Sequence, residues 1–237
     1  MGGTFPQLFP FIMLASVVVG ALVSRRYRGD LQLDTFNRFW LGMSAFTGAI
    51  LTAKIPYLIP GLPGFQNAES FLLGGKTILF GMVGGYLGVE LGKRSIGLTQ
   101  KTGDTFVVPV ATSIAIGRIA CFCAGCCYGQ PTDLPWGIVF PAVDDAARHP
   151  TQFYEFGFHL SAAFVFAWMI RRRLLKGQLI KLYFISYFGY RFVTEFIRPE
   201  ERIAAGLTAY QFAALTFAAL FAGLWWSDAR KMKAAAG

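Results

Sequence analysis

The chain has 237 residues, of which 54% are hydrophobic and only 15% are charged. A soluble domain of this length would carry more charge, so the composition argues against a soluble enzyme and indicates an integral membrane protein. The formal net charge is +9, but the basic residues lie in short segments between apolar stretches. We therefore attribute them to membrane topology and expect no nucleic-acid partner.

Seven apolar stretches are long enough to cross the hydrocarbon core, which takes about 20 residues of helix. In chain order they are residues 5–24, 39–59, 71–92, 105–122, 151–170, 178–196 and 207–226. They use nearly the whole length, so the sequence predicts an all-α integral membrane protein with seven transmembrane helices in a single domain, 1–237. Short outer loops are expected at 60–70, 123–150 and 197–206.

Lys and Arg alternate between the segments that connect these stretches. One set of segments holds fifteen of the 22 basic residues, whereas the opposite set holds only Arg148, Arg198 and Arg202. Basic residues favour the cytoplasmic side of a membrane. The pattern therefore predicts a multi-pass protein with its N-terminus outside and its C-terminus in the cytoplasm.

The fourth stretch contains Arg118 and leads into all four cysteines of the chain, within residues 117–129. A guanidinium inside a bilayer costs several kcal/mol unless something compensates it, so such a residue is a functional candidate. At 1.5 Å per residue, Arg118 lies roughly 20 Å from the inner boundary, which leaves about 10 Å to the outer one.

Two further stretches bring polar side chains to the same depth. Thirteen residues into the sixth stretch stands an arginine that is followed at i+4 and i+7 by a carboxylate and a second arginine on one helix face. The fifth stretch has polar residues at i, i+3 and i+7. These six residues are Arg191, Glu195, Arg198, Gln152, Glu155 and His159.

This polar layer has two interpretations. In the first, Arg118–Glu155 and Arg191–Glu195 are salt bridges that only hold helices together. In the second, the layer binds a ligand, because three arginines against two carboxylates leave positive charge for a phosphate, which guanidinium groups grip with paired hydrogen bonds. We favour the second interpretation, with an anionic phospholipid headgroup as the ligand.

Two other sequence features bear on packing and reactivity. Glycines four residues apart in the third stretch predict a helix face that accepts a neighbouring backbone closely, and Glu90 is expected to pair with Lys93 or Arg94. The cysteines admit three roles: small packing residues or a disulfide, reactive thiols, or metal ligands. Zinc sites usually pair distant C-x-x-C units, so we expect no metal and no other cofactor. The four are Cys121, Cys123, Cys126 and Cys127.

Three segments resemble the signatures of the prolipoprotein diacylglyceryl transferase family. Residues 148–155 (RHPTQFYE) are similar to its His-Pro-Ser-Gln-Leu-Tyr-Glu motif, and residues 190–200 (YRFVTEFIRPE) to its Arg-x-x-x-Glu-Phe-x-Arg segment. Residues 117–129 align without gaps on Gly-Arg-x-Gly-Asn-Phe-x-Asn-x-Glu-x-x-Gly. Together with seven spans in the same orientation, these blocks cover most of the chain.

The resemblance implies a bacterial plasma (inner) membrane enzyme whose active site faces the outer leaflet. It would transfer a diacylglyceryl group from phosphatidylglycerol to the thiol of a lipobox cysteine in a prolipoprotein, releasing glycerol phosphate. By resemblance the catalytic set is Arg118, Arg191, Glu195, Glu155 and His149, in which the arginines hold the phosphate and the others deprotonate the thiol or orient the arginines. The lipid-binding set adds Arg198, Gln152, Tyr154, Gly84 and Gly85.

The chain departs from the family pattern at several positions. Cys121 and Ala124 stand where the family has asparagines, Cys126 stands where it has a glutamate, and Val83 replaces a histidine before Gly84. Two alternatives therefore stay open beside the transferase. One is a divergent paralogue that uses the same lipid donor with a different acceptor. The other is a non-catalytic membrane protein that binds lipid or metal.

Overall fold

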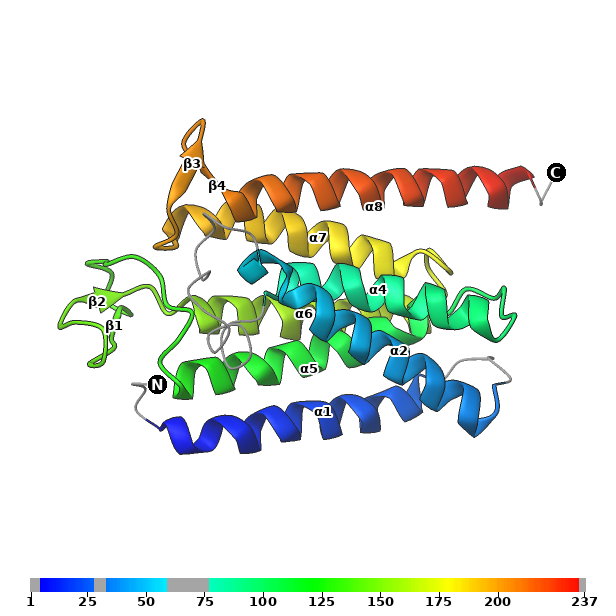
Figure 1. Cartoon of the computed structure of the whole chain (residues 1–237), viewed down its shortest axis with the longest axis horizontal. Helices are drawn as coiled ribbons and strands as arrows, with labels where there is room; N and C mark the ends of the chain where they lie inside the picture. Colours follow the sequence, from blue (N-terminus) through cyan, green and yellow to red (C-terminus); the bar gives the residue numbers. More distant parts are fainter. Residues whose placement is uncertain (1–4, 28–32, 59–76, 235–237) are drawn as a thin grey trace. The chain divides into compact units, whose positions relative to one another are not determined.

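The computed structural model describes residues 5–27, 33–58 and 77–234, and the described part is predominantly helical (Figure 1). Each helix overlaps one of the predicted apolar stretches. In chain order the helices are α1 (Phe9–Arg26), α2 (Thr35–Ala53), α4 (Ile78–Ser95), α5 (Gly103–Cys123), α6 (Thr151–Arg171), α7 (Leu179–Thr194) and α8 (Ala209–Ala234). Short 3-10 turns are η1 (Pro6–Leu8), η2 (Ile55–Leu58) and η3 (Glu195–Ile197).

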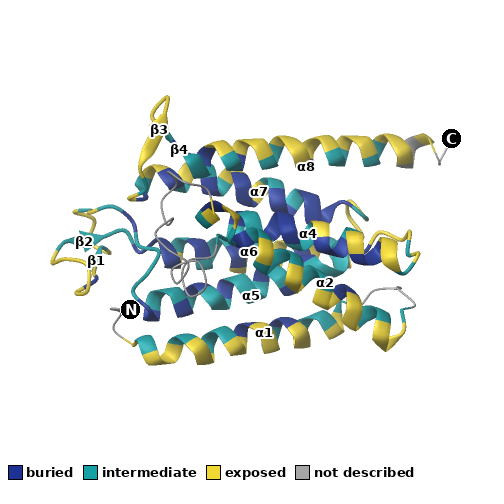
Figure 2. Ribbon diagram, in the orientation of Figure 1, coloured by how far each residue is buried: buried dark blue, intermediate teal, exposed yellow. Residues whose placement is uncertain are grey.

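Four helical segments of the described residues are long and apolar enough to cross a membrane, namely Pro6–Arg26, Gly103–Cys123, Thr151–Arg171 and Ala209–Lys231. Figure 2 shows that α1 and α8 carry many exposed residues. Several are large and apolar, including Phe11 and Leu14 on α1 and Leu220 on α8, as expected of helices that face lipid. The prediction of a helical membrane protein is confirmed in this form.

The chain divides into two compact units. The first contains α1, α5, α6, the first residues of α7 and residues 193–199. The second contains α2, α4, the middle of α7, residues 200–208 and α8. The single domain predicted for residues 1–237 stays a prediction.

In the first unit, α5 packs against both α1 and α6. Small side chains permit the approach to α1: the Ser113 hydroxyl donates a 3.0 Å hydrogen bond to the carbonyl of Ser16. A Cβ atom at Gly20 would lie only 2.0 Å from the Ser113 Oγ. The buried face of α5 is lined by Val107, Ala111 and Ala115.

Asp104, at the start of α5, fixes the start of α7. Its Oδ1 accepts a 3.0 Å hydrogen bond from the backbone N–H of Leu179, and its Oδ2 accepts one of 2.5 Å from the N–H of Gly177. The first N–H groups of a helix have no partner within the helix, so a carboxylate here acts as a cap. The cap holds the cytoplasmic-side ends predicted for these two helices together.

In the second unit, α2 packs against α4, and the predicted glycine face lies at their contact. A Cβ atom at Gly84 would lie 1.8 Å from Thr52 Oγ1 and 2.4 Å from the carbonyl oxygen of Gly48. A Cβ at Gly88 would lie 2.1 Å from the carbonyl oxygen of Ser44. The packing role predicted for these glycines is confirmed, and α2 is the partner.

Aromatic side chains fill the rest of the second unit. Phe184 of α7 contacts Phe221 of α8 edge to face, with a ring separation of 4.9 Å, and Tyr86 of α4 meets Phe221 at 5.1 Å. Such edge-to-face pairs stabilise the packing by about 1 kcal/mol each beyond the buried area. Glu90 pairs with Lys93 at 3.0 Å, as predicted.

Two of the segments predicted as loops contain short antiparallel strand pairs. In residues 123–150, β1 (Ile138–Val139) pairs with β2 (Ala147–Arg148). In residues 197–206 and just beyond, β3 (Arg202–Ala204) pairs with β4 (Leu207–Thr208). Ala205 and Gly206 between them both have positive φ, as tight hairpin turns require. The loop predicted at 60–70 lies outside the described residues.

Candidate functional site

Glu155 stands between two arginines in the first unit. Its Oε1 lies 2.5 Å from Arg118 Nη2, and its Oε2 lies 3.0 Å from Arg198 Nη2. The carboxylate comes from α6, one guanidinium from α5 and the other from the residue that follows η3. All three residues are buried, with exposed fractions of 5% or less. Charges buried this deeply persist only when paired.

The end of α7 explains how Arg198 reaches this carboxylate. The α-helix stops at Thr194, and the chain continues as the 3-10 turn η3 before it becomes extended at Arg198. The carbonyl of Arg198 accepts a 2.8 Å hydrogen bond from Gln130 Nε2. The Arg198 backbone is therefore fastened to the segment that follows α5. Its buried Nε has no hydrogen-bond partner among the described residues.

A histidine and a tyrosine extend the cluster inward. His159 is one turn along α6 from Glu155, and its Nε2 lies 3.8 Å from Glu155 Oε1. Its Nδ1 lies 2.8 Å from the hydroxyl of Tyr183, on the first part of α7. All three side chains are almost completely buried. The contacts with Tyr183 and Glu155 fix the orientation of the His159 imidazole, which supports a role for His159 in positioning Glu155.

The N-terminus of α6 holds the cysteine loop. Thr151 Oγ1 donates to the carbonyl of Cys127 at 2.5 Å, and Gln152 Nε2 donates to the carbonyl of Cys126 at 2.7 Å. Gln152 is fully buried, and its Oε1 has no hydrogen-bond partner among the described residues. The predicted lipid-binding residue Gln152 therefore positions the loop and keeps one buried acceptor.

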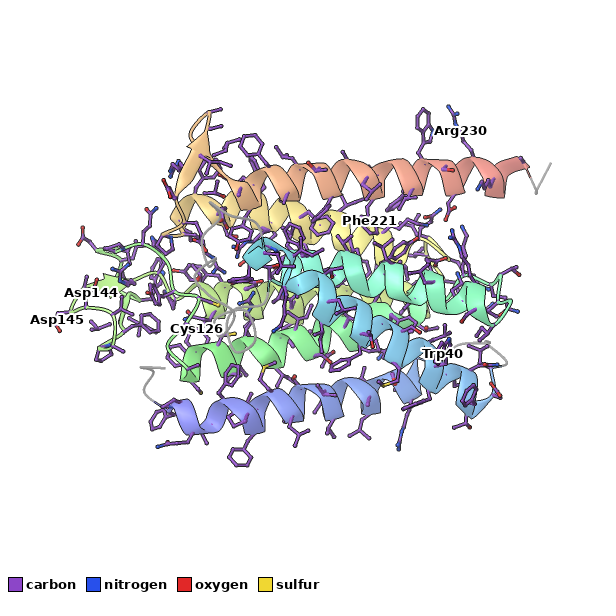
Figure 3. The ribbon with its side chains drawn as sticks, in the orientation of Figure 1. Trp40, Cys126, Asp144, Asp145, Phe221 and Arg230 are labelled. Carbon is purple, nitrogen blue, oxygen red and sulfur yellow. The ribbon has the colours of Figure 1, made fainter. Side chains whose placement is uncertain are left out.

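Three of the four cysteines meet at this loop. The sulfur atoms of Cys121, Cys126 and Cys127 all lie within 4.8 Å of one another, whereas Cys123 is buried separately. Figure 3 labels Cys126 just beyond the C-terminal end of α5. All four are free thiols, so the disulfide that the sequence left open is not formed in this structure.

The thiols differ in acidity because they hydrogen-bond to one another. Hydrogen bonds with Cys121 and Cys126 hold the pKa of Cys127 well below its usual range. Hydrogen bonds of Cys126 with Cys121 and Cys127 raise the pKa of Cys126. Cys121 Sγ also lies 4.0 Å from Arg118 Nη1. The cysteine loop and the arginine–glutamate cluster are therefore adjacent through Arg118.

His149 and Tyr154 lie at the entry to α6. The His149 Nδ1 is 3.3 Å from the Tyr154 hydroxyl, which also accepts a 2.7 Å hydrogen bond from Trp136 Nε1. A Cβ at Gly129 would lie 2.6 Å from the His149 Cβ, so the family's closing glycine permits this approach. Both predicted residues are partly accessible and share one hydrogen-bond network.

The β1–β2 hairpin is braced by an ion pair. Arg148 binds Asp144 through two hydrogen bonds, and its Nη1 donates to the carbonyl of Gly129 at 3.2 Å. The guanidinium lowers the pKa of the exposed Asp144 carboxyl. Asp144 is labelled in Figure 3, in the connection between the strands. Arg148 thus supports the backbone that presents His149.

The roles of four other predicted site residues stay predictions. Arg191 is buried in the second unit, where its guanidinium lies 5.7 Å from the Tyr210 ring centre. Its proximity to Arg118 and its pairing with Glu195 stay predictions. Glu195 is 1% exposed, in η3. Gly84 and Gly85 face α2, and their role in lipid binding stays a prediction.

The structure adds residues that the sequence did not single out. Tyr183, Gln130, Thr151 and Trp136 each hold a predicted site residue or the loop beside it. Thr151 stands beside Gln152 within the motif of residues 148–155, so its position in the sequence could have indicated a role at the site. The other three lie in apolar or loop sequence, and nothing in their spacing distinguishes them.

Comparisons with known proteins identify relatives along most of the chain. Residues 7–227 match the family model described as prolipoprotein diacylglyceryl transferase. A Clostridium tetani protein named phosphatidylglycerol–prolipoprotein diacylglyceryl transferase is 34% identical, over 80% of this chain and 78% of its own length. Proteins of the same name from Methylobacillus flagellatus and Pseudomonas putida are 34% and 33% identical, over 75% and 81% of this chain and 72% and 76% of theirs.

Proposed function

The chain belongs to the prolipoprotein diacylglyceryl transferase family, and from this premise we propose that it is a membrane-embedded transferase of the same specificity. The donor is phosphatidylglycerol, the acceptor is the thiol of a prolipoprotein cysteine, and the second product is glycerol phosphate. The relatives carry this donor and acceptor in their names.

The observation that carries the proposal is the pair of buried guanidinium groups on Glu155. A carboxylate that accepts from Arg118 and Arg198 at 2.5 and 3.0 Å holds two phosphate-binding groups side by side. The buried Nε of Arg198, which has no partner within the part of the chain that the structure describes, is a further donor for an anion. Guanidinium groups bind phosphate oxygens through paired hydrogen bonds, so the cluster suits a phosphodiester headgroup.

The reaction is an S-alkylation. The acceptor sulfur forms a bond to the glyceryl carbon of the lipid, the bond from that carbon to the phosphate oxygen breaks, and the electron pair leaves with glycerol phosphate. Charge on the phosphate grows as this bond breaks, so Arg118 and Arg198 stabilise the transition state more than the ground state. Because Glu155 accepts from both arginines, it acts as a positioning residue for them. Arg191 is proposed as a third phosphate ligand.

The proposal also includes a membrane topology, which goes beyond the four helices that are long and apolar enough to span a membrane. Seven spans, an external N-terminus and a cytoplasmic C-terminus are supported by the alternation of Lys and Arg along the chain. In that orientation the Arg118 end of α5 and the start of α6 lie in the outer leaflet of the plasma membrane. Prolipoproteins reach their modification site from that side in this scheme.

One observation favours a second candidate function. Cysteines occupy the positions of an asparagine and the glutamate in the family signature, at Cys121 and Cys126. A site that keeps the phosphate-binding arginines but has cysteines at positions 121 and 126 would bind the same lipid donor and use a different acceptor. A non-catalytic lipid-binding protein would keep the arginines as well.

A transfer assay tests the proposal. Purified protein is mixed with phosphatidylglycerol and a lipobox peptide, and mass spectrometry follows the diacylglyceryl adduct and the released glycerol phosphate. We expect both products, and a fall of at least 100-fold in turnover for Arg198→Lys, which keeps the charge but loses the planar donor set. Arg230→Lys is the matched control, because Arg230 lies over the Trp226 ring on α8.

The possible outcomes separate the candidates. Lipid consumption without a peptide adduct supports the different-acceptor paralogue. Saturable lipid binding without any consumption supports the non-catalytic protein. An equal loss of turnover in the Arg198 and Arg230 variants would contradict the assignment of Arg198 to the site.

A further inference from the structure

Three thiols converge at one point beside the arginine cluster. Cys121 lies in the last turn of α5, Cys126 and Cys127 follow it, and their sulfur atoms are mutually within 4.8 Å. Thiolates that share a tetrahedral zinc ion at bond lengths of about 2.3 Å stand about 3.8 Å apart. The sulfur triangle therefore needs to contract by only about 1 Å to hold such an ion.

The backbone is bent to bring these sulfurs together. Gly125 and Cys127 both have left-handed conformations, with φ of 66° and 64°. A residue with a side chain adopts this conformation at a cost of about 1–2 kcal/mol, so Cys127 is held there by its surroundings. The restraints are the hydrogen bonds from Thr151 and Gln152 to the loop carbonyls.

The charge near the thiols suits a thiolate–metal group. Three thiolates on a divalent ion carry one net negative charge, and a guanidinium nearby offsets it. Arg118 Nη1 lies 4.0 Å from Cys121 Sγ. Outer partners of this kind orient metal ligands and tune the ion. Three thiols are also one more than a disulfide uses, so a disulfide does not account for the convergence.

We propose that Cys121, Cys126 and Cys127 bind one Zn²⁺ ion through three thiolates and leave its fourth position open to an external ligand. Zinc sites with three protein ligands and an open position are typical of catalysis, whereas structural sites are closed by four. The described residues place three metal-ligating side chains together here, and Cys123 is not one of them.

The open fourth position of the zinc ion can bind the acceptor thiol, and this catalytic role rests on the proposed function. The sulfur of the acceptor cysteine binds the ion as a thiolate and then forms the bond to the glyceryl carbon. The carbon–oxygen bond to the phosphate breaks, and the leaving phosphate takes up the proton that the acceptor thiol released. The ion keeps its charge throughout, so no oxidant or reductant takes part. Zinc bound by these cysteines would thereby assist deprotonation of the acceptor thiol in a chain that has Cys126 where the family signature has a glutamate.

Metal analysis of the full-length protein tests the site without reference to turnover. The protein is purified in detergent with a phosphine reductant, loaded with zinc and desalted, and its thiols are counted under denaturing conditions to verify that they are reduced. We expect about one zinc per chain in the wild type. Cys121→Ser, Cys126→Ser and Cys127→Ser should each lower the zinc affinity at least 10-fold. Cys123→Ser is the matched control and should retain zinc.

Cobalt substitution tests the site in the unmutated protein, so its result does not depend on whether the cysteine variants fold. Co²⁺ in a tetrahedral thiolate site gives sulfur-to-cobalt charge-transfer absorption, which zinc should then abolish by displacement. Less than one tenth of an equivalent of zinc in a fully reduced wild type would overturn the proposal, as would equal loss of zinc in the Cys123 control.

The catalytic use is tested separately from the site. Removal of zinc with a chelator should lower diacylglyceryl transfer at least 10-fold, and stoichiometric zinc should restore it. Transfer that is insensitive to zinc removal would overturn the catalytic use while the metal site stands. Absence of transfer from zinc-loaded protein would instead count against the proposed function.

Discussion

Replacing Glu155 by glutamine removes the charge that two buried guanidinium groups share. The change keeps the side-chain shape, but its single carbonyl oxygen can accept from only one of Arg118 and Arg198, and its amide NH₂ then points a donor at the other. Breaking a buried ion pair by removing one partner costs about 3–5 kcal/mol. For a chain of this size, such a loss lowers Tm by roughly 10 °C.

The assay is thermal unfolding in detergent, followed by the near-ultraviolet signal, beside the transfer assay at a temperature where both proteins are folded. Glu90→Gln is the matched control. Glu90 pairs with Lys93 at 3.0 Å, and 37% of the Glu90 side chain is exposed against 8% of the Lys93 side chain. Because solvent reaches the Glu90 carboxylate but not Lys93, we expect the loss to be about 1 kcal/mol, at the upper end for exposed pairs, and the Tm to stay within about 4 °C of the wild type.

A double variant sharpens the test. Glu155→Gln combined with Arg198→Gln removes one charge of each sign, so its loss of stability should be smaller than the sum of the two single losses. Added phosphatidylglycerol should restore part of the Tm of Glu155→Gln, because the anionic headgroup supplies the missing negative charge. A Tm for Glu155→Gln that matches that of Glu90→Gln would refute the account of this cluster.

Further predictions concern the scaffold around the site. Gly84→Ala places a Cβ atom 1.8 Å from Thr52 Oγ1, so it should destabilise the α2–α4 pair by about 1–3 kcal/mol in thermal unfolding. Gly81→Ala, whose Cβ would meet its neighbours at 3.5 Å, should leave the stability nearly unchanged, and equal losses would contradict the packing argument. Asp104→Ala removes the cap on the start of α7 at Leu179 and should cost about 1 kcal/mol; protease sensitivity that does not rise near this residue would count against the cap.

The helices were predictable because their apolar stretches are long and bounded by basic clusters. The Arg118–Glu155 contact was also predictable, since each residue stands at a known depth on its own apolar stretch. Helix periodicity did not predict the contact between Arg198 and Glu155. The α-helix ends at Thr194, so a spacing of i+7 from Arg191 no longer describes a helix face there.

The cysteine cluster shows where sequence spacing fails. Seven residues that hold four cysteines predict crowding, but not which sulfurs meet. That choice depends on the left-handed backbone at Gly125 and Cys127 and on the anchoring of the loop to α6. The strands of the outer segments, two or three residues long, were missed because so short a run carries no alternation that could distinguish it from a loop.

The ion pair between α5 and α6 has a consequence for biosynthesis. The ribosome delivers Arg118 to the membrane first and its partner carboxylate on the next candidate span, whereas Arg198 emerges only after a further helix. A helix with an unpaired arginine partitions poorly into lipid. We therefore expect α5 to remain at the translocon until α6 arrives, and the two helices to enter the bilayer together with Arg118 and Glu155 paired. Loss of the carboxylate would therefore show first as failed insertion in the cell, before any effect on turnover is seen.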